Sequence, residues 1–250
     1  MKKDTIKKIV KDKYKEIVVS GSPCGCGCGC NSAKSISKSI GYSEEELKIA
    51  GEANLGLGCG NPVAFSKIKE GDTVLDLGSG AGIDCFLAAK KVGEKGKVIG
   101  IDMTKEMIER AESNARKRGY KNIEFILGDV EKLPLKDDSI DIIITNCVIN
   151  LTSDKAKTFK EAYRVLRPGG RIYLSDIVLL EELPEEQRNN KDLLAGCVAG
   201  ALLREDYLNK IQEAGFTVNI LRENKEISKD QYGGVALESL TVEAIKQISP

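Results

Sequence analysis

The sequence predicts an α/β fold with a mostly parallel, doubly wound sheet. From Pro62 onward, short segments rich in β-branched residues alternate with longer segments of helical periodicity. A glycine-rich turn joins the first of these strands to the first of these helices, as in other doubly wound folds. The chain has 250 residues, 41% of them hydrophobic, which is enough for one large domain with appendages.

The residues before this alternation predict an extension of helices and loops. Apolar residues recur every three or four positions over residues 4–18, which predicts a helix with one apolar face. Residues 21–29 are mainly Gly, Cys, Ser and Pro and should not form regular structure. A capping box that begins at Ser43 predicts a short helix, and a Gly-rich loop at residues 55–62 surrounds Cys59.

The central part of the chain should hold five strands with helices between them. The expected strands are short and mostly end at Gly, Asp or Asn, and they cover residues 73–77, 97–102, 123–127, 140–145 and 171–177. The expected helices cover residues 83–92, 104–118 and 154–165, with Thr104 as an N-cap. This alternation predicts helices on both faces of a parallel sheet.

The last part of the chain predicts a small α+β region. Residues 193–214 have a helical pattern, and residues 217–222 and 237–245 predict two late edge strands. Three regions are therefore expected: an N-terminal extension with a Cys-Gly run and the Cys59 loop (1–60), a Rossmann-like domain (61–180) and a C-terminal region (181–250).

Composition and charge exclude several functions. The 38 Lys and Arg residues balance the 38 Asp and Glu residues, so the net field should not attract nucleic acid. No apolar run reaches the roughly 18 residues of a membrane span, and the N-terminus lacks the apolar stretch of a signal peptide. With no histidine, the chain has no Ser-His-Asp triad and no imidazole base. We expect a cytoplasmic protein whose eight cysteines are thiols for binding or chemistry.

The glycine turn carries the first functional signal. Gly78, Gly80 and Gly82 alternate with Ser79 and Ala81, after a strand that contains Asp76. Glycines in such a turn let the backbone approach a ligand closely, and the following helix N-terminus offers free amides. The motif resembles the first motif of class I S-adenosylmethionine-dependent methyltransferases, which implies a Rossmann-like methyltransferase sheet. A glycine turn with a purely structural role is the alternative.

The next two strand ends extend this resemblance. Asp102 ends the second strand, where a carboxylate can accept both ribose hydroxyls, and Met103 beside it could lie against adenine. After the third strand, the resemblance implies that Asp129 takes the adenine amino group and that the Val130 amide takes a ring nitrogen. The set of cofactor-binding residues predicted for S-adenosylmethionine is Asp76, Gly78, Ser79, Gly80, Gly82, Asp102, Met103, Asp129, Val130 and Asn146.

Three cysteines point to the substrate. Cys147 follows the fourth strand, at the sheet edge where the methyl donor should present its sulfonium. Cys59 lies in a glycine loop, and Cys197 lies among small residues that permit close packing. Each could be an ordinary buried cysteine, as we expect for Cys85 in the helix after the glycine turn. Together, they could form a three-thiolate site.

These cysteines and their neighbours resemble the arsenite S-adenosylmethionine methyltransferases. The resemblance covers roughly residues 40–220 and is carried by residues 54–62, 76–87, 146–151 and 196–197. It implies that Cys59, Cys147 and Cys197 hold trivalent arsenic, a soft centre that suits thiolates. The implied reaction methylates arsenite or its thiol adducts as arsenic detoxification, giving S-adenosylhomocysteine. Because the nucleophile is an arsenic lone pair, no general base is required.

A thiol reductant such as glutathione or thioredoxin is also expected, with thioredoxin as a protein partner. Cys24, Cys26, Cys28 and Cys30 form an alternating Cys-Gly run. They predict either a thiol relay with metalloid capture or a mobile tail that binds soft metals adventitiously. Their spacing does not match a zinc finger, so no structural metal site is expected.

Two other functions remain open from the residues. One is a small-molecule methyltransferase of the quinone or sterol type that acts on oxygen, nitrogen or carbon, although such chemistry has no use for three thiols. The other is a metalloid-sequestering or metalloid-sensing protein that uses the N-terminal cluster.

Overall fold

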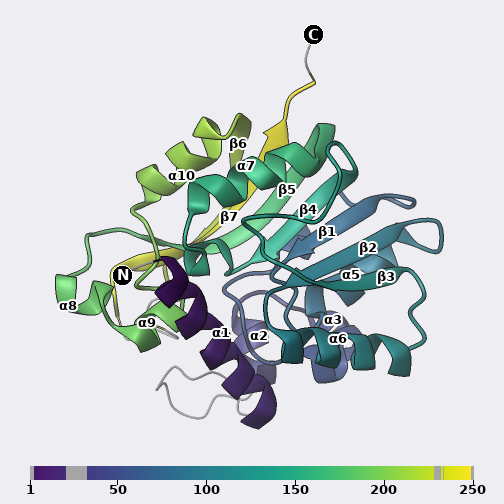
Figure 1. The fold of residues 1–250 in the computed structure, drawn as a ribbon, viewed down its shortest axis with the longest axis horizontal. Helices are drawn as coiled ribbons and strands as arrows, with labels where there is room; N and C mark the ends of the chain where they lie inside the picture. The colour runs from purple at the N-terminus through teal and green to yellow at the C-terminus, as the bar shows by residue number, and fades with distance from the viewer. Residues whose placement is uncertain (1–2, 21–32, 228–231, 233, 249–250) are drawn as a thin grey trace.

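The computed structural model describes residues 3–20, 33–227, 232 and 234–248, and these form a seven-stranded sheet between two helical layers (Figure 1). The strand order is β3-β2-β1-β4-β5-β7-β6. In chain order the strands are β1 (Thr73–Leu77), β2 (Lys97–Asp102), β3 (Ile123–Leu127), β4 (Ile140–Asn146), β5 (Leu166–Leu179), β6 (Phe216–Asn224) and β7 (Leu237–Lys246). Strands β1 to β5 pair in parallel, whereas β7 is antiparallel to both β5 and β6. The predicted Rossmann-like, mostly parallel sheet is therefore confirmed.

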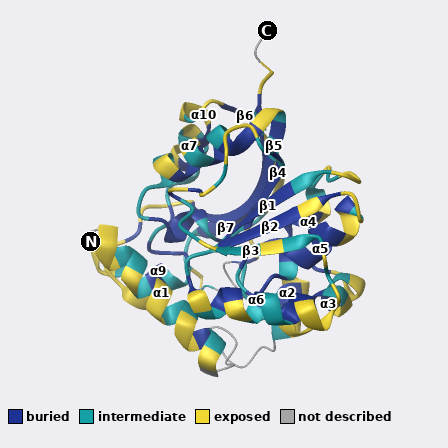
Figure 2. Ribbon diagram, turned by 45° about the vertical axis from the view of Figure 1, so that its right-hand side comes forward, coloured by how far each residue is buried: buried dark blue, intermediate teal, exposed yellow. Residues whose placement is uncertain are grey.

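The helices cover both faces of this sheet. They are α1 (Lys3–Ser20), α2 (Ala33–Ser39), α3 (Glu44–Ala50), α4 (Pro62–Phe65), α5 (Ile83–Val92), α6 (Lys105–Lys117), α7 (Lys155–Val165), α8 (Glu185–Arg188), α9 (Lys191–Ala195) and α10 (Arg204–Glu213). Alternate strand residues face opposite layers: Val74 packs into the cluster that contains α5, and Leu75 into the cluster that contains α7 and α10. Figure 2 shows the strands as a buried layer between helices with exposed outer faces.

Two predicted elements in the second half of the chain differ from the structure. Strand β5 is longer than residues 171–177 because it already pairs with β4 at Leu166 and continues along β7 to Leu179. Strand β7 is not at an edge: it lies between β5 and β6, so only β6 is an edge strand.

The single helix predicted over residues 193–214 is wrong. Helix α9 ends at Ala195, and α10 does not begin until Arg204. Cys197 has a left-handed backbone (φ 68°), which a helix interior cannot contain. Gly200 lies so close to the Asn150 carbonyl that a side chain would overlap it. The break between the two helices therefore places Cys197 in a tight turn, with its thiol against the Cys147 carbonyl at the carboxyl end of β4.

Of the two predicted helix N-caps, Ser43 caps its helix as expected and Thr104 does not. Ser43 forms the expected capping box with Glu46 at the start of α3. Thr104 is at the N-cap position of α6, but its side chain makes no capping hydrogen bond. Its backbone amide instead donates to the Asp102 carboxylate.

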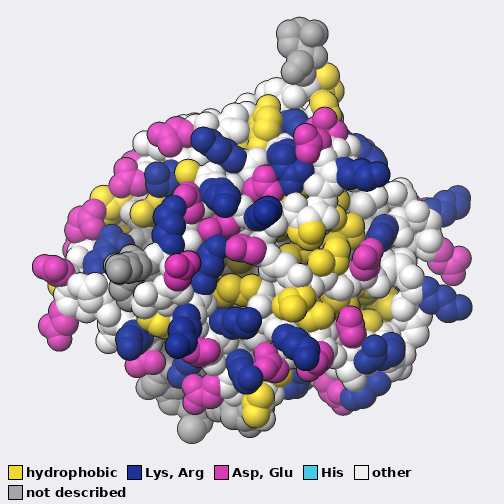
Figure 3. Space-filling model, in the orientation of Figure 1, with side chains coloured by type: hydrophobic (Ala, Val, Ile, Leu, Met, Phe, Trp, Pro, Cys, Tyr) yellow, Lys and Arg dark blue, Asp and Glu magenta, His cyan; other side chains and the backbone are white. Residues whose placement is uncertain are grey.

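The surface agrees with the balanced composition. On the face shown in Figure 3, cationic and anionic side chains are intermixed. Among the described residues, none of the helices combines the length and hydrophobicity that a membrane crossing needs.

Candidate active site

One pocket, about 1050 Å³ including the space open to solvent, lies at the carboxyl ends of β1, β2 and β4. Nine of the ten residues predicted to bind the cofactor line it: Asp76, Gly78, Ser79, Gly80, Asp102, Met103, Asp129, Val130 and Asn146. The tenth, Gly82, is not among the lining residues. It caps α5 with a left-handed backbone (φ 97°) and backs onto Phe86 and Phe125.

The glycine turn forms the floor of this pocket. Gly78 and Gly80 have φ angles of 69° and 51°, which favour glycine. A side chain at Gly78 would overlap Val148, whereas one at Gly80 would meet no protein atom within 4 Å. The Gly80 amide donates to Asp102 at 3.0 Å and so ties the turn to the end of β2.

Burial raises the pKa values of the two carboxyl groups nearest this turn, those of Asp102 and Asp76. Desolvation raises the pKa of Asp102, and the Thr104 and Gly80 amides partly offset that effect. Desolvation also raises the pKa of Asp76 well above its ordinary value, to which the neighbouring Asp84 adds. Cys85 is buried and donates its thiol to Asp76 at 3.2 Å. It lies in the core, as expected, and supports a pocket residue.

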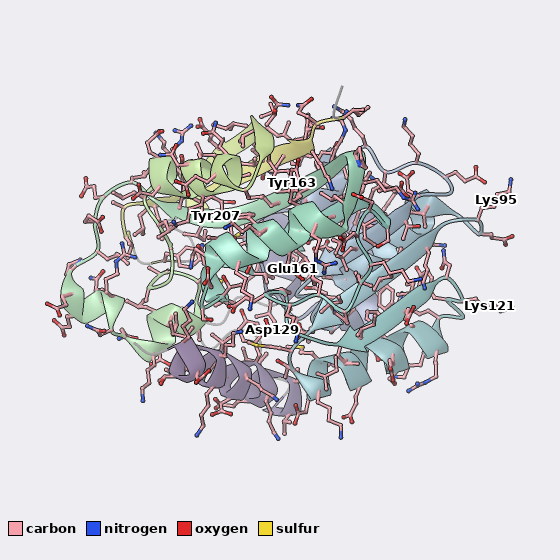
Figure 4. The ribbon with its side chains drawn as sticks, turned by 45° about the horizontal axis from the view of Figure 1, so that its top comes forward. Lys95, Lys121, Asp129, Glu161, Tyr163 and Tyr207 are labelled. Atoms are coloured by element: carbon pink, nitrogen blue, oxygen red, sulfur yellow. The ribbon has the colours of Figure 1, made fainter. Side chains whose placement is uncertain are left out.

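Helix α1 closes the other side of the pocket. Lys7 forms ion pairs with Asp129 at 2.6 Å and Glu131 at 2.7 Å, and Figure 4 shows Asp129 beside this helix. Burial alone would raise the pKa of Asp129, but the Lys7 contact and a backbone hydrogen bond outweigh it and lower that pKa. Tyr14, also on α1, lines the pocket, and burial together with the neighbouring Cys197 raises the pKa of Tyr14 well above its usual range. A predicted amphipathic helix thus contributes directly to the candidate site.

A hydrogen-bonded chain links the pocket to the Cys59 loop. The Tyr42 hydroxyl donates to Asp84 at 2.8 Å, and Asn146 donates to the Tyr42 oxygen at 2.9 Å. Asn146 also accepts from the Cys59 amide at 3.0 Å and donates to the Gly60 carbonyl at 2.7 Å. Desolvation raises the pKa of Asp84 to about 6, although the Tyr42 and Asn146 hydrogen bonds oppose that rise.

The three predicted substrate cysteines converge beside this chain, and all are buried. The Cys59 and Cys147 sulfurs lie within 4.8 Å of each other. The Cys197 thiol donates to the Cys147 carbonyl at 3.0 Å. Burial raises the pKa of the Cys59 thiol, and a hydrogen bond with Cys147 together with burial raises the pKa of Cys197 well above its usual range. The thiols are therefore neutral near pH 7 until a soft centre displaces their protons.

Strain accompanies this convergence. Cys147 and Cys197 are two of the three non-glycine residues in the described chain with positive φ, at 59° and 68°. A left-handed backbone costs energy in a non-glycine residue and persists only where the surrounding structure enforces it. Such residues cluster at functional sites. The four cysteines of the N-terminal run, Cys24, Cys26, Cys28 and Cys30, lie outside the described residues.

Sequence reasoning did not identify several polar residues of the site. Asp176 lies on β5 beside Cys59 and Cys147, and Lys155 begins α7 nearby. Asp84 and Tyr42 form the link described above. A carboxylate two residues after the glycine turn was the one signal for Asp84, whereas Asp176 lies inside the strand predicted over residues 171–177, where no motif marks it as functional.

Comparisons with known proteins place this arrangement in a family context. A family model described as a methyltransferase domain matches residues 68–215. The arsenite methyltransferase of Halobacterium salinarum is 42% identical over 259 residues, which cover 96% of this chain and 66% of that protein. The human arsenite methyltransferase is 43% identical over 188 residues, covering 69% of this chain and 50% of that protein. The chain thus spans between half and just under two thirds of the length of these two relatives.

A solved structure has the same fold. The crystal structure of an arsenic(III) S-adenosylmethionine methyltransferase from Chlamydomonas reinhardtii is 35% identical and matches with a TM-score of 0.66. The match covers 86% of this chain and 74% of that one.

Proposed function

Because the chain belongs to the family of arsenic(III) S-adenosylmethionine methyltransferases, we propose that it transfers a methyl group from S-adenosylmethionine to thiol-bound arsenite as a detoxification reaction. The observation that carries the proposal is the convergence of three buried cysteines beside one pocket. Cys147 itself lines the pocket that also contains the glycine turn and the Asp102 carboxylate. A quinone or sterol methyltransferase has no use for this thiol cluster.

The residues present fit an S-adenosylmethionine molecule. Gly80 leaves open space where any other residue would place a side chain, and Asp102 ends β2 in the position suited to a ribose. When bound, the cofactor supplies an electrophilic methyl group on a sulfonium. Asp76 is the proposed partner of its amino acid moiety, and Met103, Asp129 and Val130 are the proposed adenine contacts.

The protein's own task is to hold the arsenic. Three thiols replace the three hydroxyls of arsenite, and three water molecules leave with the thiol protons. The resulting arsenic atom has a lone pair that attacks the methyl carbon, and the carbon–sulfur bonding pair stays on sulfur to give S-adenosylhomocysteine. No proton moves in that step, so no base is needed. Orientation of this kind can contribute about 7 to 11 kcal/mol.

The proposal includes a reductant and a location. Methyl transfer raises the formal oxidation state of arsenic, and a two-electron thiol reductant such as glutathione or thioredoxin would return it to the trivalent state. A cytoplasmic location would supply that reductant and keep the cysteines as thiols. Omitting all thiols from the assay should therefore stop turnover after the first methylation.

Serine substitution tests the site directly. Cys147→Ser and Cys197→Ser should each reduce arsenite methylation at least tenfold, because an alkoxide is a poor ligand for a soft centre. S-adenosylmethionine affinity, measured by calorimetry, should stay within about twofold because neither cysteine is a proposed cofactor contact. Wild-type turnover in either variant would overturn the assignment. Cofactor binding by the wild type without arsenic-dependent turnover would overturn the proposed function.

A further inference from the structure

In the described chain, the three side chains whose potential metal-ligating atoms group together are not the three cysteines: an aspartate takes the place of Cys197. The Cys59 and Cys147 sulfurs and one Asp176 carboxylate oxygen all lie within 4.8 Å of one another, and all three residues are buried. They come from the loop before α4, the position directly after β4 and the C-terminal part of β5. The fold therefore places two thiols and one carboxylate around a common point.

Asp176 is held in a fixed orientation by its neighbours. Its Oδ2 accepts from the Tyr207 hydroxyl at 2.8 Å and from the Ile149 amide at 3.2 Å, and its Oδ1 accepts from Asn150 at 3.3 Å. A carboxylate has about four acceptor positions, so one lone pair stays available for another ligand. Neighbours that orient a carboxylate in this way are typical of metal sites.

The charge around the site also suits a cation. The Cys59, Cys147 and Cys197 thiolates and the Asp176 carboxylate would together carry four negative charges, and a divalent cation would leave two. Lys155 lies near both Asp176 and Cys197 and is partly buried. Its ammonium would offset one of these charges: burial lowers the Lys155 pKa to about 8, against the opposing effect of Asp176 and Cys197, so it stays charged near pH 7.

Arsenic(III) and divalent cations differ in the number and type of ligands that they bind. Arsenic(III) binds three sulfurs and directs a lone pair outward, so it has no position for a carboxylate. Zinc takes four ligands in a tetrahedron from sulfur, nitrogen and oxygen, with Zn–S near 2.3 Å and Zn–O near 2.0 to 2.2 Å. Those bond lengths put two sulfurs about 3.8 Å apart, which is compatible with the observed grouping.

We propose that Cys59, Cys147 and Asp176 bind Zn²⁺, with Cys197 as the fourth ligand, and that this cation competes with arsenite for the cysteines. On binding, the three thiol protons pass to solvent. The cation occupies the substrate position and does not hold the fold together. Its binding does not depend on the proposed methyl transfer, so the two claims can fail separately.

The test needs a background without the N-terminal thiols, since those would bind zinc themselves. We would use the full chain with Cys24, Cys26, Cys28 and Cys30 changed to serine, reduced and free of oxygen. Co²⁺ serves as the spectroscopic probe, and its affinity, together with that of Zn²⁺ by competition, is measured. This protein should bind one cation with the intense visible absorption of a tetrahedral, thiolate-ligated cobalt site.

Asp176→Asn decides whether the carboxylate is a ligand. It should weaken Co²⁺ and Zn²⁺ binding by about tenfold or more, in line with the effect of changing metal-site residues. Arsenite affinity, in contrast, should stay within about twofold. The matched control is Asp137→Asn, an exposed carboxylate that pairs with Arg164 in the last turn of α7, at the other end of this helix from Lys155, and it should change neither. Cys59→Ser should weaken the binding of both the cation and arsenite.

Three results would overturn the proposal. They are unchanged cation affinity in Asp176→Asn, an equal loss of cation and arsenite affinity in that variant, and no cation bound by the background protein. If Asp176→Asn fails to fold, X-ray absorption of the zinc-loaded background protein replaces it. A shell of oxygen near 2.0 Å beside sulfur near 2.3 Å supports the site, and a sulfur-only shell refutes it.

Discussion

Asn146 holds the Cys59 loop on the sheet with both ends of one amide. Its oxygen accepts from the Cys59 amide at 3.0 Å, and its nitrogen donates to the Gly60 carbonyl at 2.7 Å. Gly58 packs so closely on Asn146 that a side chain at Gly58 would require it to shift. The residue predicted as a cofactor contact therefore also fixes the position of Cys59, which we propose as a ligand of the substrate.

Replacing this amide should misplace Cys59. Asn146→Ala leaves the Cys59 amide and the Gly60 carbonyl without these hydrogen-bond partners. Each unsatisfied buried group costs about 1 to 3 kcal/mol of stability. We expect a lower free energy of unfolding and a fall of about 10²-fold in arsenite methylation, since small misplacements of reacting groups are that costly. Urea denaturation and product analysis measure the two effects.

Asn122→Ala is the control for that experiment. Asn122 donates one hydrogen bond to the Gly93 carbonyl, at the opposite edge of the sheet. Its loss should lower stability by about 1 kcal/mol and leave methylation unchanged. Wild-type turnover in Asn146→Ala, or equal loss of turnover in both variants, would contradict the positioning role.

The backbone at Cys147 predicts an unusual order of stability. Because its φ is 59°, glycine suits the position better than alanine does. Cys147→Gly should therefore be about 1 kcal/mol more stable than Cys147→Ala, while both variants lose arsenite methylation. Thermal denaturation of the two proteins checks this, and a more stable alanine variant would show that the backbone is not strained there.

The sequence predicted the parallel part of the fold better than it predicted the site. Strands β1 to β3 and helix α5 have the expected bounds because local pattern and tertiary role agree there. The helix predicted over residues 193–214 failed because Gly200 meets the Asn150 carbonyl, a contact across the fold that no local pattern records. For the same reason, three cysteines far apart in the chain could be grouped by resemblance, whereas Asp176 could not be found by any spacing.

Asp176 and Asp84 should make the arsenic-free protein less stable as pH rises. Burial raises the pKa of Asp176 to about 7 and that of Asp84 to about 6, both above the value of 3.8 expected in the unfolded chain. A raised carboxyl pKa contributes stability that is complete below the unfolded pKa and is lost as pH passes the folded pKa. The window is therefore about pH 4 to 7, and the contribution of Asp176 is on the order of a few kcal/mol.

Urea denaturation between pH 5 and pH 8 measures this dependence. Lys155 acts outside that window, because burial lowers its pKa to about 8 from 10.5, and the associated loss of stability occurs as pH falls from 10.5 to 8. Asp176→Asn should flatten the decline up to about pH 7, most clearly between pH 6 and pH 7 where Asp84 no longer contributes, and leave the parts due to Asp84 and the other buried carboxyls. An identical slope in wild type and variant would show that Asp176 does not titrate in this range.

The glycine turn predicts opposite results for two alanine substitutions. In Gly78→Ala, the new methyl group overlaps Val148, which follows Cys147 directly, and the φ of 69° is also unfavourable for alanine. Overpacking costs about 1 to 3 kcal/mol, and the left-handed backbone adds about 1 kcal/mol or more. We expect a clear drop in melting temperature together with weaker arsenite binding, because Val148 and Cys147 must move.

In Gly80→Ala, the methyl group meets no protein atom and instead projects into the space proposed for the cofactor. Only the backbone contribution, about 1 to 2 kcal/mol, should affect stability. S-adenosylmethionine affinity should fall at least tenfold, while arsenite affinity stays near that of the wild type. Calorimetry with each ligand separates the two variants. Unchanged cofactor affinity in Gly80→Ala would mean that the glycine turn is structural and that the cofactor binds elsewhere in the pocket.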